Sequence, residues 1–357
     1  MKLPGLIDVH VHLREPGATH KEDFLSGTKA ALAGGVTTVL AMPNTQPPLV
    51  DESSLHKAVS AGHEKALCDY GVYLGGSMEN ADLLPQIADQ SVGLKLYLDA
   101  TYGPLLLEDT MHWRKLFESW PRSRPIVAHA EGKTLAALLY IAFMYDRHVH
   151  ICHVSTREEI CLIKSAKEKG LPVTCEVTPH HLFLSEEDIP TLGKSGKSEV
   201  RPRLASRDDQ RALWDHLEVI DCFATDHAPH TLAEKEGEDP PPGFPGLETA
   251  LPLFLNAVHE GRLSMEDVVT RMYTNPRSVF GLPEQQKTWI EVDLKRKYEI
   301  QAADQYSKSG WTPFEGWTGL GCVERVVLRG EEVFRNGEIL TTAGGGRNVA
   351  PSITYQA

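Results

Sequence analysis

The amino-acid sequence predicts an α/β fold, namely a (β/α)8 TIM-type barrel with a small β-rich appendage formed mainly by the C-terminal segment. Two observations support this prediction. Up to about residue 285, short apolar runs alternate with amphipathic segments, and eight such runs occur, as eight parallel βα units require. Beyond that point, strand-like runs follow one another without helical segments between them.

The eight expected strands are short, apolar and rich in β-branched residues, and they cover residues 6–13, 36–42, 71–74, 93–97, 125–128, 149–152, 173–177 and 219–224. Amphipathic periodicity predicts helices over residues 21–33, 54–66, 81–88, 111–120, 133–145, 156–169 and 207–216. An open, doubly wound sheet is the alternative. No Gly-x-Gly-x-x-Gly turn follows the first strand, which disfavours it.

The expected organisation is a barrel over residues 1–285, an appendage over 286–342 and a linker-like tail over 343–357. Residues 231–246 form an acidic, proline-rich loop that interrupts the barrel pattern, and 247–260 and 265–280 look helical. Strands are expected at 290–294, 323–329 and 332–334, followed by an Asn336-Gly337 turn.

Composition excludes several classes of function. The net charge of −13 argues against nucleic-acid binding as the main task. No apolar run reaches membrane-spanning length and no signal-peptide pattern is present, so we expect no membrane partner. The six cysteines lie singly without a Cys-x-x-Cys pair, which is typical of reduced thiols in a cytoplasmic protein.

Histidines and a carboxylate recur where expected strands end. His10 and His12 are two residues apart, so their side chains point to the same side of the first strand, and Arg14 follows two residues later. Alone, this pair could merely pack or form hydrogen bonds. The ends of later strands carry further polar residues, namely Lys95, His129, His153 and Asp226. Because functional residues of such barrels collect at the carboxyl ends of strands, the coincidence favours a metal site.

These residues lie in motifs that resemble the dihydroorotases of the amidohydrolase superfamily. The motifs, in chain order, are Asp8-Val9-His10-Val11-His12, Met42-Pro43-Asn44-Thr45, Lys95-Leu96-Tyr97, His129-Ala130-Glu131, Cys152-His153-Val154 and Asp226-His227-Ala228-Pro229-His230. The stretches Glu176–His181, Pro241–Gly246 and Trp311–Gly316 further resemble the dihydroorotase domain of CAD-type multifunctional pyrimidine-synthesis polypeptides.

The resemblance implies two zinc ions bridged by Lys95 in its carbamylated form (carboxylysine), with a bridging hydroxide as nucleophile. His10, His12 and Asp226 would complete one metal, and His129 and His153 the other. Asp226 would act as general acid and base. Cys152 and Glu176 could hold a third, accessory zinc with His10; alternatively they are a buried thiol and a carboxylate that orients ligands.

The implied reaction is the reversible cyclisation of N-carbamoyl-L-aspartate to L-dihydroorotate, a step of pyrimidine synthesis. Residues at the family's substrate positions are Arg14, Asn44 and His230 for the free carboxylate, Arg201 as a weaker candidate, and Pro242 and Gly243 for the ring. Thr101 matches a catalytic threonine on a mobile loop. Tyr102 stands where the CAD-type loop is expected to carry Phe, which leaves the sealing of the loop open.

Two alternatives remain. The chain could act on hydantoin, dihydropyrimidine or allantoin rings, or it could be a catalytically silent scaffold. The carboxylate-binding set disfavours the first alternative, and the complete set of metal ligands disfavours the second. From the resemblance we also expect a homodimer, fused in the full-length protein to carbamoyl phosphate synthetase and aspartate transcarbamylase.

Overall fold

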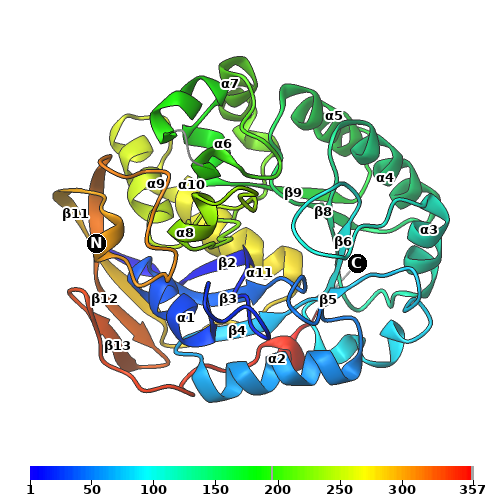
Figure 1. Cartoon of the computed structure of the whole chain (residues 1–357), viewed down its shortest axis with the longest axis horizontal. Helices are drawn as coiled ribbons and strands as arrows, with labels where there is room; N and C mark the ends of the chain where they lie inside the picture. The colour runs from blue at the N-terminus through cyan, green and yellow to red at the C-terminus, as the bar shows by residue number, and fades with distance from the viewer. Residues whose placement is uncertain (194–195, 355–357) are drawn as a thin grey trace.

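Parallel strands alternate with helices along most of the chain, as predicted. The computed structural model describes residues 1–193 and 196–354. Helices lie outside the strands (Figure 1). The parallel strands are β2 (Leu6–Val11), β3 (Val36–Ala41), β4 (Asp69–Val72), β5 (Leu74–Gly75), β6 (Leu94–Tyr97), β7 (Ile126–His129), β8 (Val149–Ile151), β9 (Val173–Val177) and β10 (Cys222–Phe223).

The parallel strands form two sheets, ordered β2-β3-β4 and β10-β9-β8-β7-β6-β5. Tyr73 alone separates β4 from β5, and its N–H donates to the carbonyl of Ala41 in β3 (3.0 Å). At the other end, Val11 of β2 pairs with His227 in an isolated parallel bridge, and the N–H of His12 donates to the carbonyl of His227 (2.7 Å). Backbone contacts therefore link the two sheets at both ends.

The outer helices are α1 (Phe24–Ala33), α2 (Glu52–Lys65), α3 (Thr110–Ser119), α4 (Gly132–Met144), α5 (Arg157–Glu168), α7 (Arg207–Asp215), α9 (Ala250–His259), α10 (Met265–Val269) and α11 (Asn275–Phe280). Asp23 caps α1, its side chain accepting the N–H of Ser26 (2.8 Å). The helix consequently begins at Phe24, and Lys21, expected as its first residue, lies outside it. None of the helices in the described residues is long and apolar enough to span a membrane.

Some local predictions were wrong. The expected helix over 81–88 is instead two 3-10 turns, η1 (Leu84–Gln86) and η2 (Ala88–Gln90), because Pro85 supplies no N–H and the segment is short. The expected helix over 265–280 contains a π-helical turn, η6 (Thr270–Thr274), between α10 and α11. Two short helices beside the site were not predicted, α6 (Pro179–Phe183) and α8 (Leu232–Lys235).

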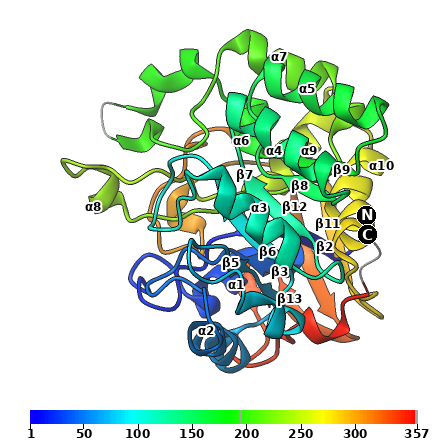
Figure 2. The ribbon, with the colours of Figure 1, turned by 90° about the vertical axis from the view of Figure 1, so that its right-hand side faces the viewer.

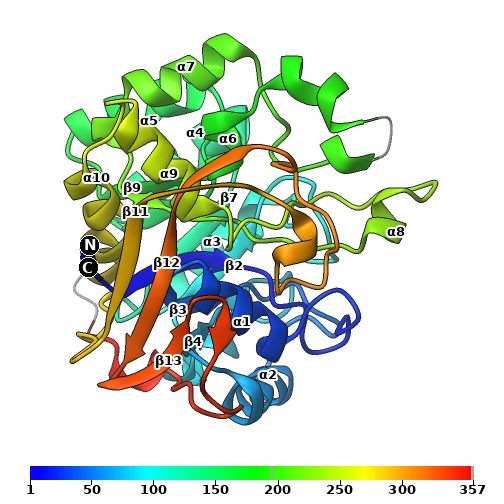
Figure 3. The same ribbon diagram turned by 90° about the vertical axis from the view of Figure 1, so that its left-hand side faces the viewer.

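A third sheet is antiparallel and has the strand order β1-β11-β12-β13-β14. Its members are β1 (Lys2–Pro4), β11 (Trp289–Glu299), β12 (Thr318–Leu328), β13 (Glu331–Arg335) and β14 (Glu338–Ile339). The sheet packs along α9 and α1 at one side of the parallel strands (Figures 1 and 3). Its first strand comes from the N-terminus, so both ends of the chain contribute to it.

The segment expected to be linker-like is packed as far as residue 354. The N–H of Tyr70 donates to the carbonyl of Arg347 (2.9 Å), and the N–H of Val349 donates back to Tyr70 (2.8 Å). Val349, Ala350 and Ile353 are buried in the apolar cluster that fills the space between the parallel strands. This segment therefore belongs to the folded unit.

Candidate functional site

The structure brings the predicted metal ligands together where the parallel strands end. His10 and Lys95 lie within β2 and β6, His129 ends β7, and His153 and Asp226 follow β8 and β10 by two and three residues. Figure 2 shows that loops following the strands, including the one with α8, project on one side of the molecule. All five side chains are buried.

Two groups of ligand atoms converge. The Oδ1 atom of Asp226 lies 3.1 Å from His10 Nε2 and 3.0 Å from His12 Nε2. His129 Nδ1 lies 3.0 Å from His153 Nε2, and the rings of His10 and His153 are 5.3 Å apart. Imidazole and carboxylate atoms in this arrangement form a suitable set of donors for zinc.

The outer nitrogens of three of the four histidine rings are held by acceptors. His10 Nδ1 contacts Glu176, whose other oxygen lies 3.1 Å from His150 Nε2. His129 Nε2 contacts Glu131 (2.9 Å), and His12 Nδ1 contacts the Oδ1 atom of Asn44 (2.7 Å). An acceptor on the outer nitrogen fixes the tautomer and leaves the inner lone pair free for a metal.

Burial and charge set the protonation states. Burial lowers the pKa of His12 to about 4, and it lowers that of His153 well below the usual range, with His129 adding to the effect. Burial also opposes protonation of His10, but the charges of Glu176 and Asp226 outweigh it and raise the pKa of His10 to about 10. Burial would raise the pKa of Asp226, yet His10 and His12 hold it well below its usual range. The site therefore favours an ionised Asp226 beside a positive charge.

Lys95 has no counter-ion. Its ammonium is fully buried and donates to Cys152 Sγ (2.7 Å), and no ion pair to it occurs among residues 1–193 and 196–354. His153 Nδ1 is likewise buried without a hydrogen-bond partner. A buried, unpaired ammonium costs several kcal/mol, of the order of the desolvation penalty of an ion. These observations fit a lysine that carries a carbamate, which would be an anion among histidines and metals.

Cys152 and Glu176, the candidate ligands of an accessory metal, already have partners. Cys152 accepts from Lys95, although its Sγ also lies within 4.8 Å of ligand atoms of His10 and His153. Glu176 uses both oxygens on His10 and His150. The role of Glu176 as an orienting carboxylate accounts for its contacts, and the accessory metal stays a prediction.

Beside the ligands lies a positively charged corner. The buried Arg14 donates from Nε to the carbonyl of Pro229 (3.1 Å), its Nη2 lies 3.0 Å from His230 Nε2, and its Nη1 has no partner. Burial lowers the pKa of His230 far below its usual range, and Arg14 and Lys21 add to the effect, so this ring is neutral. An unsatisfied guanidinium N–H is suited to an anionic ligand.

The other predicted substrate residues share one small cavity with these groups. Its volume is about 20 Å³, and Thr101 and Tyr102 of the 99–105 loop line it. Its walls are His10, His12, Arg14, Asn44, Tyr97, Thr101, Tyr102, His129, His153, Arg201, Asp226, Ala228, Pro242 and Gly243. A cavity of this size holds about one water molecule, so a ligand with a six-membered ring requires the loop to move.

Sequence reasoning missed two buried lysines that lie behind the residues of the site. Lys21 contacts His230 Nδ1 (3.1 Å) and pairs with Glu234 (2.9 Å). Lys235 is fully buried and donates to the carbonyls of Glu199 (2.8 Å), Pro241 (2.9 Å) and Gly243 (3.3 Å). Neither lysine stands in a recognisable motif. By contrast His181, which follows β9, contacts Thr178 and the carbonyl of Pro202 and has a packing role.

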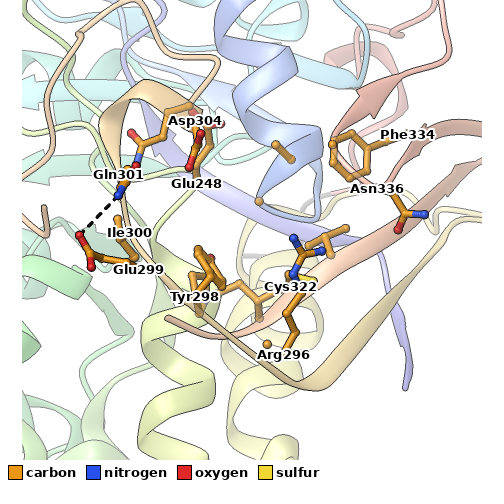
Figure 4. Close-up of a pocket in the computed structure, with 18 residues that line it drawn as sticks. Glu248, Arg296, Tyr298, Glu299, Ile300, Gln301, Asp304, Cys322, Phe334 and Asn336 are labelled. Atoms are coloured by element: carbon orange, nitrogen blue, oxygen red, sulfur yellow. Dashed lines mark hydrogen bonds between the residues drawn. The ribbon is translucent and has the colours of Figure 1, made fainter. Parts of the chain in front are cut away.

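A larger cavity of about 390 Å³ lies between α1, α9 and the antiparallel sheet (Figure 4). Glu248 faces it, but its carboxylate accepts the backbone N–H groups of Tyr306 and Ser307. Glu299 accepts from the Gln301 side chain (3.5 Å). This cavity shares no lining residue with the one beside the converging ligands, and Glu248 and Glu299 are engaged in local contacts.

Comparison with known proteins agrees with this site. Residues 1–285 match the model of the amidohydrolase family. Multifunctional protein CAD of Squalus acanthias is 55% identical over 98% of this chain, which spans only 16% of that protein. A dihydroorotase of Pyrococcus abyssi is 40% identical over 97% of this chain and 87% of its own length.

Solved structures share the fold. An L-hydantoinase (dihydropyrimidinase) from Arthrobacter aurescens superposes with a TM-score of 0.91 at 26% identity, covering 98% of this chain and 88% of its own. An inactive dihydroorotase-like domain of the Chaetomium thermophilum CAD-like multifunctional protein gives 0.83 at 29% identity, with 98% of each chain covered. On the family match and the sequence relatives, this chain belongs to the amidohydrolase family and, within it, to the dihydroorotases.

Proposed function

We propose that this chain is a zinc-dependent dihydroorotase that interconverts N-carbamoyl-L-aspartate and L-dihydroorotate, the third step of de novo pyrimidine synthesis. The observation that carries the proposal is the convergence of His10, His12, His129, His153 and Asp226 around the unpaired Lys95, beside a buried arginine with a free N–H. The sequence relatives described as dihydroorotases support the same activity.

Two zinc ions would be held by His10, His12 and Asp226, and by His129 and His153, with carbamylated Lys95 between them. Bound there, the metals would polarise the reacting carbonyl and activate water at neutral pH. The carboxylates of Glu176 and Glu131 hold two of the histidine rings in the coordinating orientation.

Asp226 would move the proton. In the hydrolytic direction, its carboxylate accepts a proton from the attacking water and delivers it to the ring nitrogen as the amide C–N bond breaks. In the synthetic direction, it takes the proton from the carbamoyl nitrogen as the C–N bond forms and water leaves. The histidines beside Asp226 hold its pKa well below the usual range, so the carboxylate is ionised before the reaction begins.

The positively charged corner would select the substrate. Arg14 and Asn44 line the cavity beside the ligands, His230 contacts Arg14, and the free Arg14 N–H would bind the carboxylate that dihydroorotate carries and dihydrouracil lacks. Arg201, Pro242 and Gly243, which line the same cavity, would contact the ring, and Thr101 would reach the substrate from the loop. This argues against a hydantoinase-type substrate despite the shared fold.

A catalytically silent domain is the second alternative, since one solved relative of this fold is described as inactive. In this chain every expected ligand position carries a residue able to coordinate zinc, and the residues converge. Retention of the full set favours an active enzyme.

The proposal extends to organisation. The backbone links at both ends of the parallel sheets support a closed barrel over residues 1–285, with the antiparallel sheet, mainly residues 286–342, as its appendage. A homodimer is supported by the exposed apolar side chains of Tyr140, Phe143 and Met144 on α4, exposed by 63%, 61% and 60%.

Fusion to carbamoyl phosphate synthetase and aspartate transcarbamylase in the full-length protein would follow the multifunctional relatives. A cytoplasmic location is supported by six free cysteines, four of them buried.

The test is an assay of the purified chain with dihydroorotate, carbamoyl-aspartate and dihydrouracil, together with its zinc content. We expect bound zinc and interconversion of the first two compounds. Turnover of dihydrouracil without turnover of dihydroorotate would contradict the substrate, and a zinc-loaded but inert protein would favour the silent domain.

A further inference from the structure

Lys21 contacts three segments of the chain around the positively charged corner formed by Arg14 and His230. It lies between β2 and α1, and only 5% of its surface is exposed. Its ammonium pairs with Glu234 of α8 (2.9 Å), contacts His230 Nδ1 (3.1 Å) and donates to the Tyr102 hydroxyl (3.2 Å). An ammonium has three protons, and each has one partner here.

The contact with His230 determines how that ring is protonated. An ammonium can only donate, so His230 Nδ1 must accept, and the single proton of the neutral ring lies on Nε2. Nε2 lies 3.0 Å from the carbonyl of Pro242, which accepts this proton. Arg14 Nη2, also 3.0 Å from Nε2, can itself only donate, so it forms no hydrogen bond with Nε2 in this form of the ring. The contacts with Lys21 and Pro242 together therefore favour an N–H on the side of the ring that faces Arg14.

The contact with Tyr102 ties the loop to the same corner. The carbonyl of Tyr102 accepts from Asn44 Nδ2 (2.9 Å), and its ring meets His230 edge-on at 5.0 Å. The loop can make these two contacts with any aromatic residue at this position. The hydrogen bond from Lys21 needs the tyrosine hydroxyl, so it depends on the residue in which this chain departs from the Phe of the resembled loop.

We propose that Lys21 is a positioning residue, which orients His230 as a donor to the substrate carboxylate and latches the 99–105 loop through the Tyr102 hydroxyl. The proposal rests on the proposed dihydroorotase function and deepens it. Glu234 neutralises Lys21, so the net positive charge of Arg14 remains available for the anion. Substrate binding and loop closure would thus be coupled through one side chain.

Kinetics of Lys21→Met, Tyr102→Phe and the double variant test the latch. A hydrogen bond from a charged donor contributes about 1.5–3 kcal/mol, so we expect Lys21→Met to raise KM for dihydroorotate roughly tenfold to a hundredfold, with a smaller change in kcat and unchanged zinc content. Tyr102→Phe should raise KM severalfold in the parent and have no effect in the Lys21→Met background. Equal effects of Tyr102→Phe in both backgrounds would overturn the latch.

A second measurement does not need turnover. Nitrogen-15 NMR of the histidines, with His230→Gln to assign the resonance, reports which ring nitrogen of His230 carries the proton. We expect the Nε2–H form in the parent and a mixture of forms in Lys21→Met. An Nδ1–H form in the parent would overturn the positioning role, whereas absence of dihydroorotase activity with the Nε2–H form retained would refute only the proposed function.

Discussion

The two sides of the candidate site bury a lysine in different ways. On the metal side, the ammonium of Lys95 donates to the thiol of Cys152 and lies 5.0 Å from the ring of Tyr97, and no carbonyl or carboxylate of residues 1–193 and 196–354 accepts from it. Behind the lining residue Gly243, Lys235 donates to three backbone carbonyls and lies 5.2 Å from the ring of Trp311. Both ammonium groups are fully buried.

The difference shows what each side requires. The ammonium of Lys235 donates to three carbonyls, so its surroundings suit an unmodified lysine that fixes the backbone of these residues. The surroundings of Lys95 instead consist of histidines whose inner nitrogens face a common space, which suits an anion and metals. We therefore expect changes on the metal side to affect the chemical step and metal content, and changes on the other side to affect binding and stability.

The largest effect is expected from Asp226→Asn. Loss of a general acid and base lowers rates by roughly 10²–10⁴-fold, and Asp226 is also a metal ligand, so kcat should fall at least about 10³-fold. Steady-state assays in both directions measure this. Circular dichroism should show an intact fold, and a kcat within tenfold of the parent would contradict the assigned role.

The matched pair Lys95→Met and Lys235→Met should change stability in opposite directions. In the zinc-free protein, removal of an unpaired buried charge is neutral or stabilising, so Lys95→Met should keep or raise the melting temperature. Lys235→Met leaves three carbonyls without their donor and should destabilise by about 1–3 kcal/mol or more.

Thermal melts after chelation compare the two variants directly. Lys95→Met should also lose zinc when metal is restored, whereas Lys235→Met should retain it. Equal destabilisation by both substitutions would contradict the expected difference between the surroundings of Lys95 and Lys235.

Glu176→Gln tests how the ligands are oriented. Glutamine keeps the shape of Glu176 but loses the charge that holds the Nδ1 proton of His10. Loss of such a carboxylate typically costs roughly 10–100-fold in metal affinity, which competition with a chelator would measure. Glu131→Gln, which changes a half-exposed partner of His129, is the control and should have the smaller effect.

Arg14→Lys addresses binding on the other side. Lysine keeps the charge but loses the planar fork, so KM for dihydroorotate should rise roughly tenfold while kcat changes less. Steady-state assays with dihydroorotate separate the two constants. A fall in kcat with unchanged KM would instead place Arg14 in the chemical step.

The smallest effect concerns pH. Burial lowers the pKa of Lys235 from 10.5 to about 7, so above pH 7 the folded chain binds fewer protons than the unfolded chain. Stability due to this residue should therefore rise with pH from about 7 towards 10.5, by roughly 1 kcal/mol over the first pH unit. Denaturant unfolding at several pH values should show this rise in the parent and not in Lys235→Met.

Local periodicity explains why much of the site could be predicted. His10 and His12 share a strand face because strand side chains alternate, and Lys95, His129, His153 and Asp226 could be placed at strand ends without knowledge of their neighbours. The same local rules failed over residues 81–88, where a proline and a short segment produced 3-10 turns. They also misplaced the start of α1, because Asp23 caps the helix, which begins at Phe24 and not at Lys21.

The amino-acid sequence by itself therefore determined the order of strands and helices, the identity of the candidate ligands and the family. Only the tertiary structure decided which of the buried lysines has oxygen or nitrogen acceptors around its ammonium group. The contact of Lys21 with His230 joins residues 209 positions apart, and that of Lys95 with Cys152 joins residues 57 apart. The energy of a buried charge depends on the acceptors that surround it in space, and no local sequence pattern specifies them.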